Sequence, residues 1–407
     1  MSPRRVAATR EVERLRRGGS GAGRPKRRMT LMLWTGVGLG AAVGLLAAVE
    51  LAVRWHFRRR SRSYAFFPNS TVVYHPDPAA SAYLDPVTER RINELGERGG
   101  PLPKGPGRVL RGLVLGGSAA ECLLLDQPKT WPAVLESLLQ RAADEGRLPA
   151  GRVHVGNVAR AMVNAQGLLR MARRLLPERE RLEWIFVMTG YPVVLRWLNH
   201  GAELDAAIPP YDDDDLFAVS PDFGFGWGLK GSATRKALAF WKHRRRPRVV
   251  REAGQFLLRN RRMRAAATDF VSLPNVAESR YFAESCEHLR ALIRLCRRHA
   301  ERVIVIGQGW IELEGLSPEQ QRLLWFGRVG EGPEWRFAST QSLTEAYEAV
   351  HRATLALARE EGAETIDGRA VVPGEFGMFY DDGHYANAGA KVLAEALAAH
   401  VLGEPSA

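Results

Sequence analysis

Three residue types that together can cleave an ester lie in two short segments, far apart in this 407-residue sequence. Residues 114–121 read VLGGSAAE, which places Ser118 on a glycine-rich turn directly after an apolar run. Residues 380–389 read YDDGHYANAG, which places Asp381 three residues before His384. A hydroxyl nucleophile, an imidazole base and a carboxylate that orients the imidazole are the components of serine-esterase chemistry. We therefore predict that Ser118, His384 and Asp381 are catalytic.

Each of these segments also has an ordinary structural explanation. A Ser between a strand and a helix is often a helix cap, and a His after Asp-Gly can be a plain turn residue. Their order in the chain, together with Gly389 and a helical pattern directly after His384, favours the catalytic interpretation.

The same segments resemble a known family. Gly116-Gly117-Ser118 resembles the nucleophile block of the SGNH (GDSL-type) hydrolases, in a Gly-Gly-Ser variant, and Asp381-x-x-His384 resembles their last block. Residues 153–159 (VHVGNVA) are similar to the second block and residues 188–192 (MTGYP) to the third. Residues 93–99 (NELGERG) resemble a lead-in found in membrane-anchored members. The resemblance covers residues 90–402.

The resemblance implies how the oxyanion of the reaction would be stabilised. The backbone N–H of Ser118 would be one donor, and Ala159 aligns with the Gly whose backbone N–H is the second. The third donor of the family is an Asn side chain, where this chain has Pro192, which offers neither a side-chain donor nor an N–H. Losing one such donor typically costs about 10²–10³ in rate. The polar side chains that could replace it are Asn157, Asn164 and Gln308, and the possible pocket residues are Asn157, Gln308 and Pro192.

The pattern around these segments predicts an α/β fold. Short apolar runs typical of buried parallel strands occupy residues 109–115, 153–155, 184–188 and 303–306. Amphipathic stretches alternate with them, at residues 131–143, 168–176, 277–299, 343–361 and 387–401. This alternation predicts a three-layer α/β/α sandwich with a parallel sheet; the resemblance makes it flavodoxin-like and SGNH-type, over residues 106–402.

The first hundred residues differ from the rest of the chain in their charge and in the elements that they predict. The net charge of +13 is concentrated in residues 1–62, which hold fifteen Lys and Arg against three acidic residues, so the body is nearly neutral and a nucleic-acid partner is not indicated. Residues 31–49 carry no charge, and we predict a basic cytoplasmic tail at 1–29, an uncleaved transmembrane anchor at 30–53 and an irregular, proline-rich neck at 54–105. Eight basic residues before the anchor (10–29) against five after it (50–69) predict that the N-terminus is cytoplasmic and the body lies outside the cytoplasmic membrane.

Residues 199–275 interrupt the α/β alternation, and we interpret them as an insertion that forms a lid or a membrane-facing flap. Residues 230–264 carry thirteen Lys and Arg, one acidic residue and aromatic side chains, a composition suited to anionic lipid headgroups or to an ordinary solvated helix. The four consecutive acids at 212–215 lack the alternating spacing of a calcium loop, and no Cys/His spacing matches a zinc site. No metal or cofactor is predicted.

Two functions from different classes remain open on this reading. The first is a membrane-anchored esterase or deacylase acting on an ester of the cell envelope, such as an O-acetyl or lipid ester. The second is a catalytically weakened binding protein of the same fold, and an acyltransferase acting on an envelope glycan lies between them. The retained Ser118, Asp381 and His384 favour chemistry, whereas Pro192 favours reduced activity.

Overall fold

The computed structural model describes residues 24–229, 231–330 and 336–404, so most of the predicted basic tail lies outside the described residues. The chain divides into two compact units. One consists of Met1–Arg59 with Phe225–Ala237, and the other of Arg60–Gly224 with Leu238–Ala407. The larger unit contains all the residues that are predicted to be catalytic.

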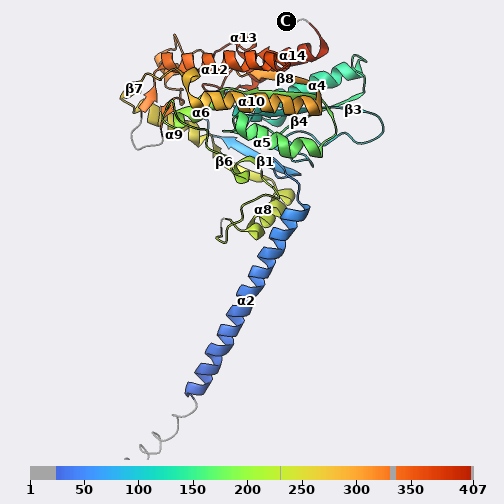
Figure 1. Cartoon of the computed structure of the whole chain (residues 1–407), viewed down its shortest axis with the longest axis vertical. Coiled ribbons are helices and arrows are strands. Elements are labelled where there is room, and N and C mark those ends of the chain that lie inside the picture. The colour runs from blue at the N-terminus through green and yellow to red at the C-terminus, as the bar shows by residue number, and fades with distance from the viewer. Residues whose placement is uncertain (1–23, 230, 331–335, 405–407) are drawn as a thin grey trace, which may run out of the picture. The chain divides into compact units, whose positions relative to one another are not determined.

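A five-stranded parallel sheet forms the centre of the larger unit (Figure 1). Every pair of neighbouring strands is parallel. Their order is β11 (Glu364–Asp367), β8 (Ala300–Gly307), β5 (Leu182–Thr189), β3 (Val109–Gly116) and β4 (Arg152–Asn157). Counted along the chain this is the 2-1-3-4-5 order of flavodoxin-like proteins, so the predicted fold class is confirmed. The sequence analysis missed only β11, which is short and half polar.

Helices cover the sheet in two groups, as buried parallel strands require. In one group α10 (Arg280–His299) packs on α5 (Ala165–Leu175) and α12 (Thr340–Glu360), and α12 packs on α6 (Tyr191–Asn199). In the other, α4 (Trp131–Asp144) packs on α14 (Asn387–Leu402). The boundaries follow from capping: the hydroxyls of Ser279 and Ser339 accept backbone N–H groups at the starts of α10 and α12.

The predicted neck, residues 54–105, differs from the irregular segment that we expected. It contains β1 (Ser70–Pro76) and β2 (Thr88–Ile92), which pair in antiparallel orientation. The strand β6 (Arg248–Ala253), from the predicted insertion, pairs in parallel with the other edge of β1. The prolines mark the ends of these strands, and the partner strand lies about 170 residues away, so local pattern could not reveal the pairing.

The segment that we interpret as an insertion lies between β5 and β8, and its described residues add no strand to the central sheet. It contains α7 (Asp213–Leu216), α8 (Ala233–Arg245), β6, α9 (Gln255–Ala265) and β7 (Asp269–Val271), which joins β10 (Arg336–Ala338) and β9 (Arg328–Val329) in a small sheet. The acidic cluster has a structural role: Asp212 and Asp215 form a capping box on α7, and Asp213 accepts hydrogen bonds from Arg170 and Ser220.

The smaller unit is dominated by α2 (Arg24–Arg60), a helix of 37 residues. An 18-residue window of its segment Leu33–Arg60 has a mean hydropathy of 2.0, and in the described part of the chain this is the one helix long and apolar enough to cross a membrane. Large apolar side chains on it, such as Leu33 and Trp34, are exposed. Near its end Glu50 accepts hydrogen bonds from the Ser232 hydroxyl and from the backbone N–H groups of Ala233 and Thr234.

Candidate active site

Ser118 lies on a tight turn between the interior strand β3 and the one-turn helix α3 (Ser118–Glu121). Two glycines make the turn possible. A Cβ added at Gly116 would lie 2.5 Å from Ala120 Cβ, and one at Gly117 would lie 2.6 Å from Pro192 Cγ. The turn therefore presents Ser118 at the carboxyl end of β3, where the strand order of the sheet reverses and where such folds bind their ligands.

The structure brings the three predicted catalytic side chains together. Nε2 of His384 lies 2.7 Å from Oγ of Ser118, and Nδ1 of His384 lies 2.8 and 2.9 Å from the two carboxylate oxygens of Asp381. Asp381 is fully buried, and its Oδ1 also accepts the backbone N–H groups of Gly383 and His384. The carboxylate is thus fixed on one side of the imidazole, and Ser118 occupies the other.

Two aromatic rings fix the plane of the imidazole. Tyr380 and Trp325 stack on His384 with centroid distances of 5.4 and 6.2 Å and interplanar angles of 8° and 7°. Burial lowers the pKa of His384, but the charge of Asp381 and its hydrogen bond raise it by more, so the pKa lies above its ordinary value of 6.5. The imidazole is therefore a stronger base than a free histidine.

A cavity of about 390 Å³ opens beside Ser118 and His384. Its wall is mainly apolar, and α9 of the insertion contributes to it through Phe256 and Asn260. The other lining residues are Leu123, Ala161, Met162, Tyr191, Leu195, Asn199, Trp325, Phe326, Gly327, Arg328 and Tyr380. The volume falls in the range of small-molecule sites, so an acyl or alkyl group fits next to the nucleophile.

The predicted second oxyanion donor, Ala159, is not available for that role. Its backbone N–H donates to Oδ1 of Asn157 at 2.8 Å. Met162, three residues later, borders the cavity and has a φ of 65°, which is unusual for a residue with a side chain. Among the described residues, neither the N–H of Met162 nor that of Ser118 has a protein acceptor. Backbone strain of this kind clusters at functional sites, so the N–H of Met162 is a candidate for the role that was predicted for Ala159.

The three polar residues predicted as substitute donors, Asn157, Asn164 and Gln308, do not line the cavity beside Ser118. Asn157 is buried and donates to the carbonyl of Ala120, so it holds the turn of Ser118 rather than lining the cavity. Asn164 caps α5 and donates to the hydroxyl of Tyr281. Gln308 is buried and donates to the carbonyl of Gly383 at 2.9 Å. Its role is to support the loop that carries His384.

Pro192 starts α6 and is buried against Gly117, directly behind the turn of Ser118. The third block is therefore in the expected place, and its missing amide leaves this side of the turn without a side-chain donor. The pyrrolidine ring fills the space and fixes the first turn of α6, since proline is well suited to that position.

The segment NELGERG, residues 93–99, stabilises the active site through buried charged side chains. Arg98 is buried and donates to the carbonyls of Glu121, Cys122 and Leu125, which lie at the end of α3 and just after it. Glu97 is also buried and pairs with Arg179 at 2.8 Å. The hydrogen bonds of Arg98 therefore hold α3 in the position that orients Ser118.

The sequence analysis did not identify Met162, Trp325, Tyr380 or Asp382 as site residues. Asp382 accepts the backbone N–H groups of Trp325 and Phe326, and so holds the cavity wall; burial and the neighbouring Asp381 raise its pKa to about 6. The one signal in the sequence was adjacency, because Tyr380 and Asp382 flank Asp381. Trp325 and Met162 lie on other segments, and only the tertiary structure brings them to the cavity.

No protein-family model matches this sequence, and a search of curated proteins finds no match. Among solved structures the chain is similar to an acetylxylan esterase from Geobacillus stearothermophilus, with 14% identity and a TM-score of 0.38 over 73% of this chain and 95% of that one. It is also similar to a member of the lipolytic G-D-S-L family from Veillonella parvula DSM 2008, with 11% identity and a TM-score of 0.37 over 72% of this chain and 97% of that one. These similarities assign neither an activity nor a substrate to this chain.

Proposed function

We propose that this protein is a serine esterase that is anchored in the cytoplasmic membrane and hydrolyses a carboxylic ester of the cell envelope. The observation that carries the proposal is the hydrogen-bonded series from Ser118 through His384 to Asp381 at the border of a mainly apolar cavity. The 2.7 Å separation of Ser118 and His384 is already within hydrogen-bond reach.

The geometry supports a two-step reaction through an acyl-enzyme. Oγ of Ser118 attacks the ester carbonyl while Nε2 of His384 takes the hydroxyl proton. The tetrahedral intermediate then collapses, the bond to the alcohol breaks, and His384 returns its proton to the leaving oxygen. A water molecule, deprotonated by His384, attacks the acyl carbon. The bond from that carbon to Oγ of Ser118 then breaks, His384 returns the proton to Oγ, and the carboxylic acid is released. Asp381 keeps the imidazole in the required tautomer and stabilises its positive charge.

The oxyanion that forms during each step needs hydrogen-bond donors. The backbone N–H of Ser118 and that of Met162 are the donors that we assign to it, in place of the pair that includes Ala159. Pro192 occupies the position of the third donor and offers no hydrogen-bond donor there. This difference from the family pattern is the observation that favours a weakened enzyme or a binding protein as the alternative function.

The membrane part of the proposal is supported by α2. The segment Leu33–Arg60 exposes its apolar side chains, and the charge difference around it favours a cytoplasmic N-terminus. The helix α8 adds exposed Leu238 and Trp241 to a basic sequence, which suits the headgroup region of an anionic bilayer. External protease should digest the body of the protein in spheroplasts and spare the leader; digestion only after lysis would contradict this topology.

The esterase proposal is tested by covalent labelling of the full-length protein in detergent. A fluorophosphonate probe should modify wild type at Ser118, identified by peptide mass spectrometry, and should leave Ser118→Ala unmodified. Ser137→Ala is the matched control, because Ser137 is an exposed residue on α4 and its loss should not affect labelling. An unlabelled wild-type protein that retains its native circular dichroism would favour the binding-protein alternative. Acyl transfer to an added glycan in preference to water would identify an acyltransferase.

A further inference from the structure

A second cavity, of about 560 Å³, lies beside the one that contains Ser118. The two cavities have no lining residue in common, but neighbouring residues of the same two segments line them. Along α9, Asn260 borders the first cavity and Arg264 the second, one helical turn or about 6 Å further on. Opposite α9, residues 321–324 contribute Gln321, Arg322 and Leu324 to the second cavity, whereas Trp325 begins the wall of the first.

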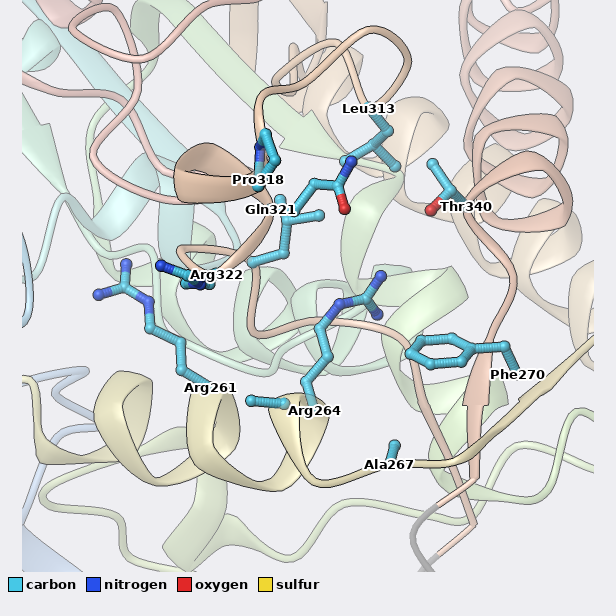
Figure 2. Close-up of a pocket in the computed structure, with 11 residues that line it drawn as sticks. Arg261, Arg264, Ala267, Phe270, Leu313, Pro318, Gln321, Arg322 and Thr340 are labelled. Carbon is cyan, nitrogen blue, oxygen red and sulfur yellow. The ribbon is translucent and has the colours of Figure 1, made fainter.

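The second cavity is strongly basic. Arg261 and Arg264 rise from α9, and Arg322 approaches from the opposite segment (Figure 2). No Asp or Glu is among its lining residues, and within residues 24–229, 231–330 and 336–404 none of the three guanidinium groups forms an ion pair. Three like charges around one cavity repel one another, so an anion bound between them gains free energy from all three.

The hydrogen bonds of these arginines leave donors unused. Arg264 donates to the carbonyl of Phe326, and Arg261 donates to the carbonyls of Leu323 and Ala80. Arg261 is only 7% exposed, and its Nη2 is buried and has no partner in the described part of the chain. A buried guanidinium nitrogen without an acceptor costs free energy, and burial lowers the pKa of both Arg261 and Arg264. The buried carboxylates offset part of this cost by Coulomb attraction: Asp381 and Asp382 attract Arg261, and Asp382 attracts Arg264.

We propose that this cavity binds the carboxylate of an acidic sugar unit that belongs to the same substrate chain as the ester. The inference rests on the proposed esterase function, since it names the substrate class of that enzyme: an acylated, uronate-containing glycan. Arginine forks pair with planar carboxylates through two parallel hydrogen bonds. Gln321 and Thr340, which border the same space in Figure 2, offer an amide and a hydroxyl for sugar hydroxyl groups. A headgroup of an anionic lipid is the competing ligand, and the concave, partly polar lining favours the sugar.

The test is equilibrium binding to the full-length Ser118→Ala protein in detergent, so that catalysis does not enter the measurement. The ligands for calorimetry are a galacturonic acid trimer and a neutral galactose trimer. We expect the acidic trimer to bind at least about tenfold more tightly than the neutral one, as a charged bidentate contact allows, and its affinity to fall with added salt.

The variant Arg322→Gln should weaken the acidic trimer about tenfold or more, and because Arg322 is exposed this change leaves the fold intact. Arg264→Lys, which keeps the charge and removes the fork at a half-buried position, should also weaken the acidic trimer. The control is Arg262→Gln, which removes the same charge from an exposed residue of α9 outside the cavity and should leave the affinity unchanged.

Equal affinity for both trimers, or equal effects of Arg322→Gln and Arg262→Gln, would overturn the proposal. Loss of binding to phosphatidylglycerol vesicles in Arg322→Gln, without any uronate binding, would assign the cavity to lipid instead. Uronate binding by a protein that fails the fluorophosphonate test would keep the sugar site and remove the esterase.

Discussion

Trp325 and His384 lie parallel, with 6.2 Å between their ring centroids and 7° between their planes. An indole face stabilises a neighbouring cation, so it favours the imidazolium that forms when Ser118 loses its proton. We expect Trp325→Leu to lower kcat/KM for p-nitrophenyl acetate about 3- to 10-fold, from a contact of about 0.5–1.5 kcal/mol. Trp241→Leu, on the exposed face of α8, is the matched control. An unchanged kcat/KM in Trp325→Leu would show that the stacking has no catalytic role.

The pH dependence of hydrolysis follows from the raised pKa of His384. Only the neutral imidazole can accept the proton of Ser118, so activity is lost as the pH falls through the pKa, and the midpoint of the kcat/KM profile should lie above 6.5. Asp381→Asn removes the main cause of the increase, and should shift the midpoint to lower pH while lowering kcat by about 10⁴. A midpoint below 6.5 in wild type would contradict this assignment of the base.

Met162 tests the revised oxyanion hole through its backbone. Its φ of 65° is easily adopted by Gly and is strained in Ala. We therefore expect Met162→Gly to be more stable than Met162→Ala by about 1 kcal/mol, measured by urea unfolding, while both retain kcat within a few-fold, because the backbone donor remains. A severe loss of kcat in both variants would mean that the side chain, rather than the N–H, serves the reaction.

Pro192→Asn would introduce a side-chain amide next to the turn of Ser118. A Cβ added at Gly117 would lie 2.6 Å from Pro192 Cγ, so an amide at this position would lie next to the turn that carries Ser118. We expect kcat to increase by up to about 10–10², since a complete donor is worth about 10²–10³. Pro192→Ala, which opens the same space without a donor, is the control. A faster Pro192→Ala would attribute the gain to loosened packing.

Glu97 and Arg179 form a buried ion pair. Burial raises the pKa of Glu97, but His154 and Arg179 lower it by more, to about 2. Since the folded-state pKa is below the ordinary value of 4.5, the charged form contributes stability above that pH, and this contribution is lost as the pH falls toward 2. We expect Glu97→Gln to destabilise the fold by about 3–5 kcal/mol, because it leaves Arg179 buried without a partner. Glu89→Gln, which breaks the more exposed pair with Arg91, should change the melting temperature little.

Local sequence pattern was sufficient for most of the α/β body. The apolar runs that become β3, β5 and β8 stay apolar because parallel strands are covered on both faces, so their positions can be seen without any partner. Pairing between distant segments could not be seen in this way. The strand β6 pairs with β1 across about 170 residues, and its exposed, partly charged sequence carries no apolar signal.

The sequence alone determined Ser118, Asp381 and His384, because a glycine-rich turn after a strand and an Asp-x-x-His loop before a helix are local features with a fixed order. Only the tertiary structure decided their surroundings. Ala159 donates its N–H to Asn157, whereas the N–H of Met162 has no protein acceptor among the described residues. The difference follows from backbone angles that cannot be predicted from residue type. Trp325 and the three arginines of the second cavity come from segments that meet only when the insertion folds against the sheet. Chemistry that depends on one loop can be predicted from its residues, whereas a cavity is a property of the contacts between loops.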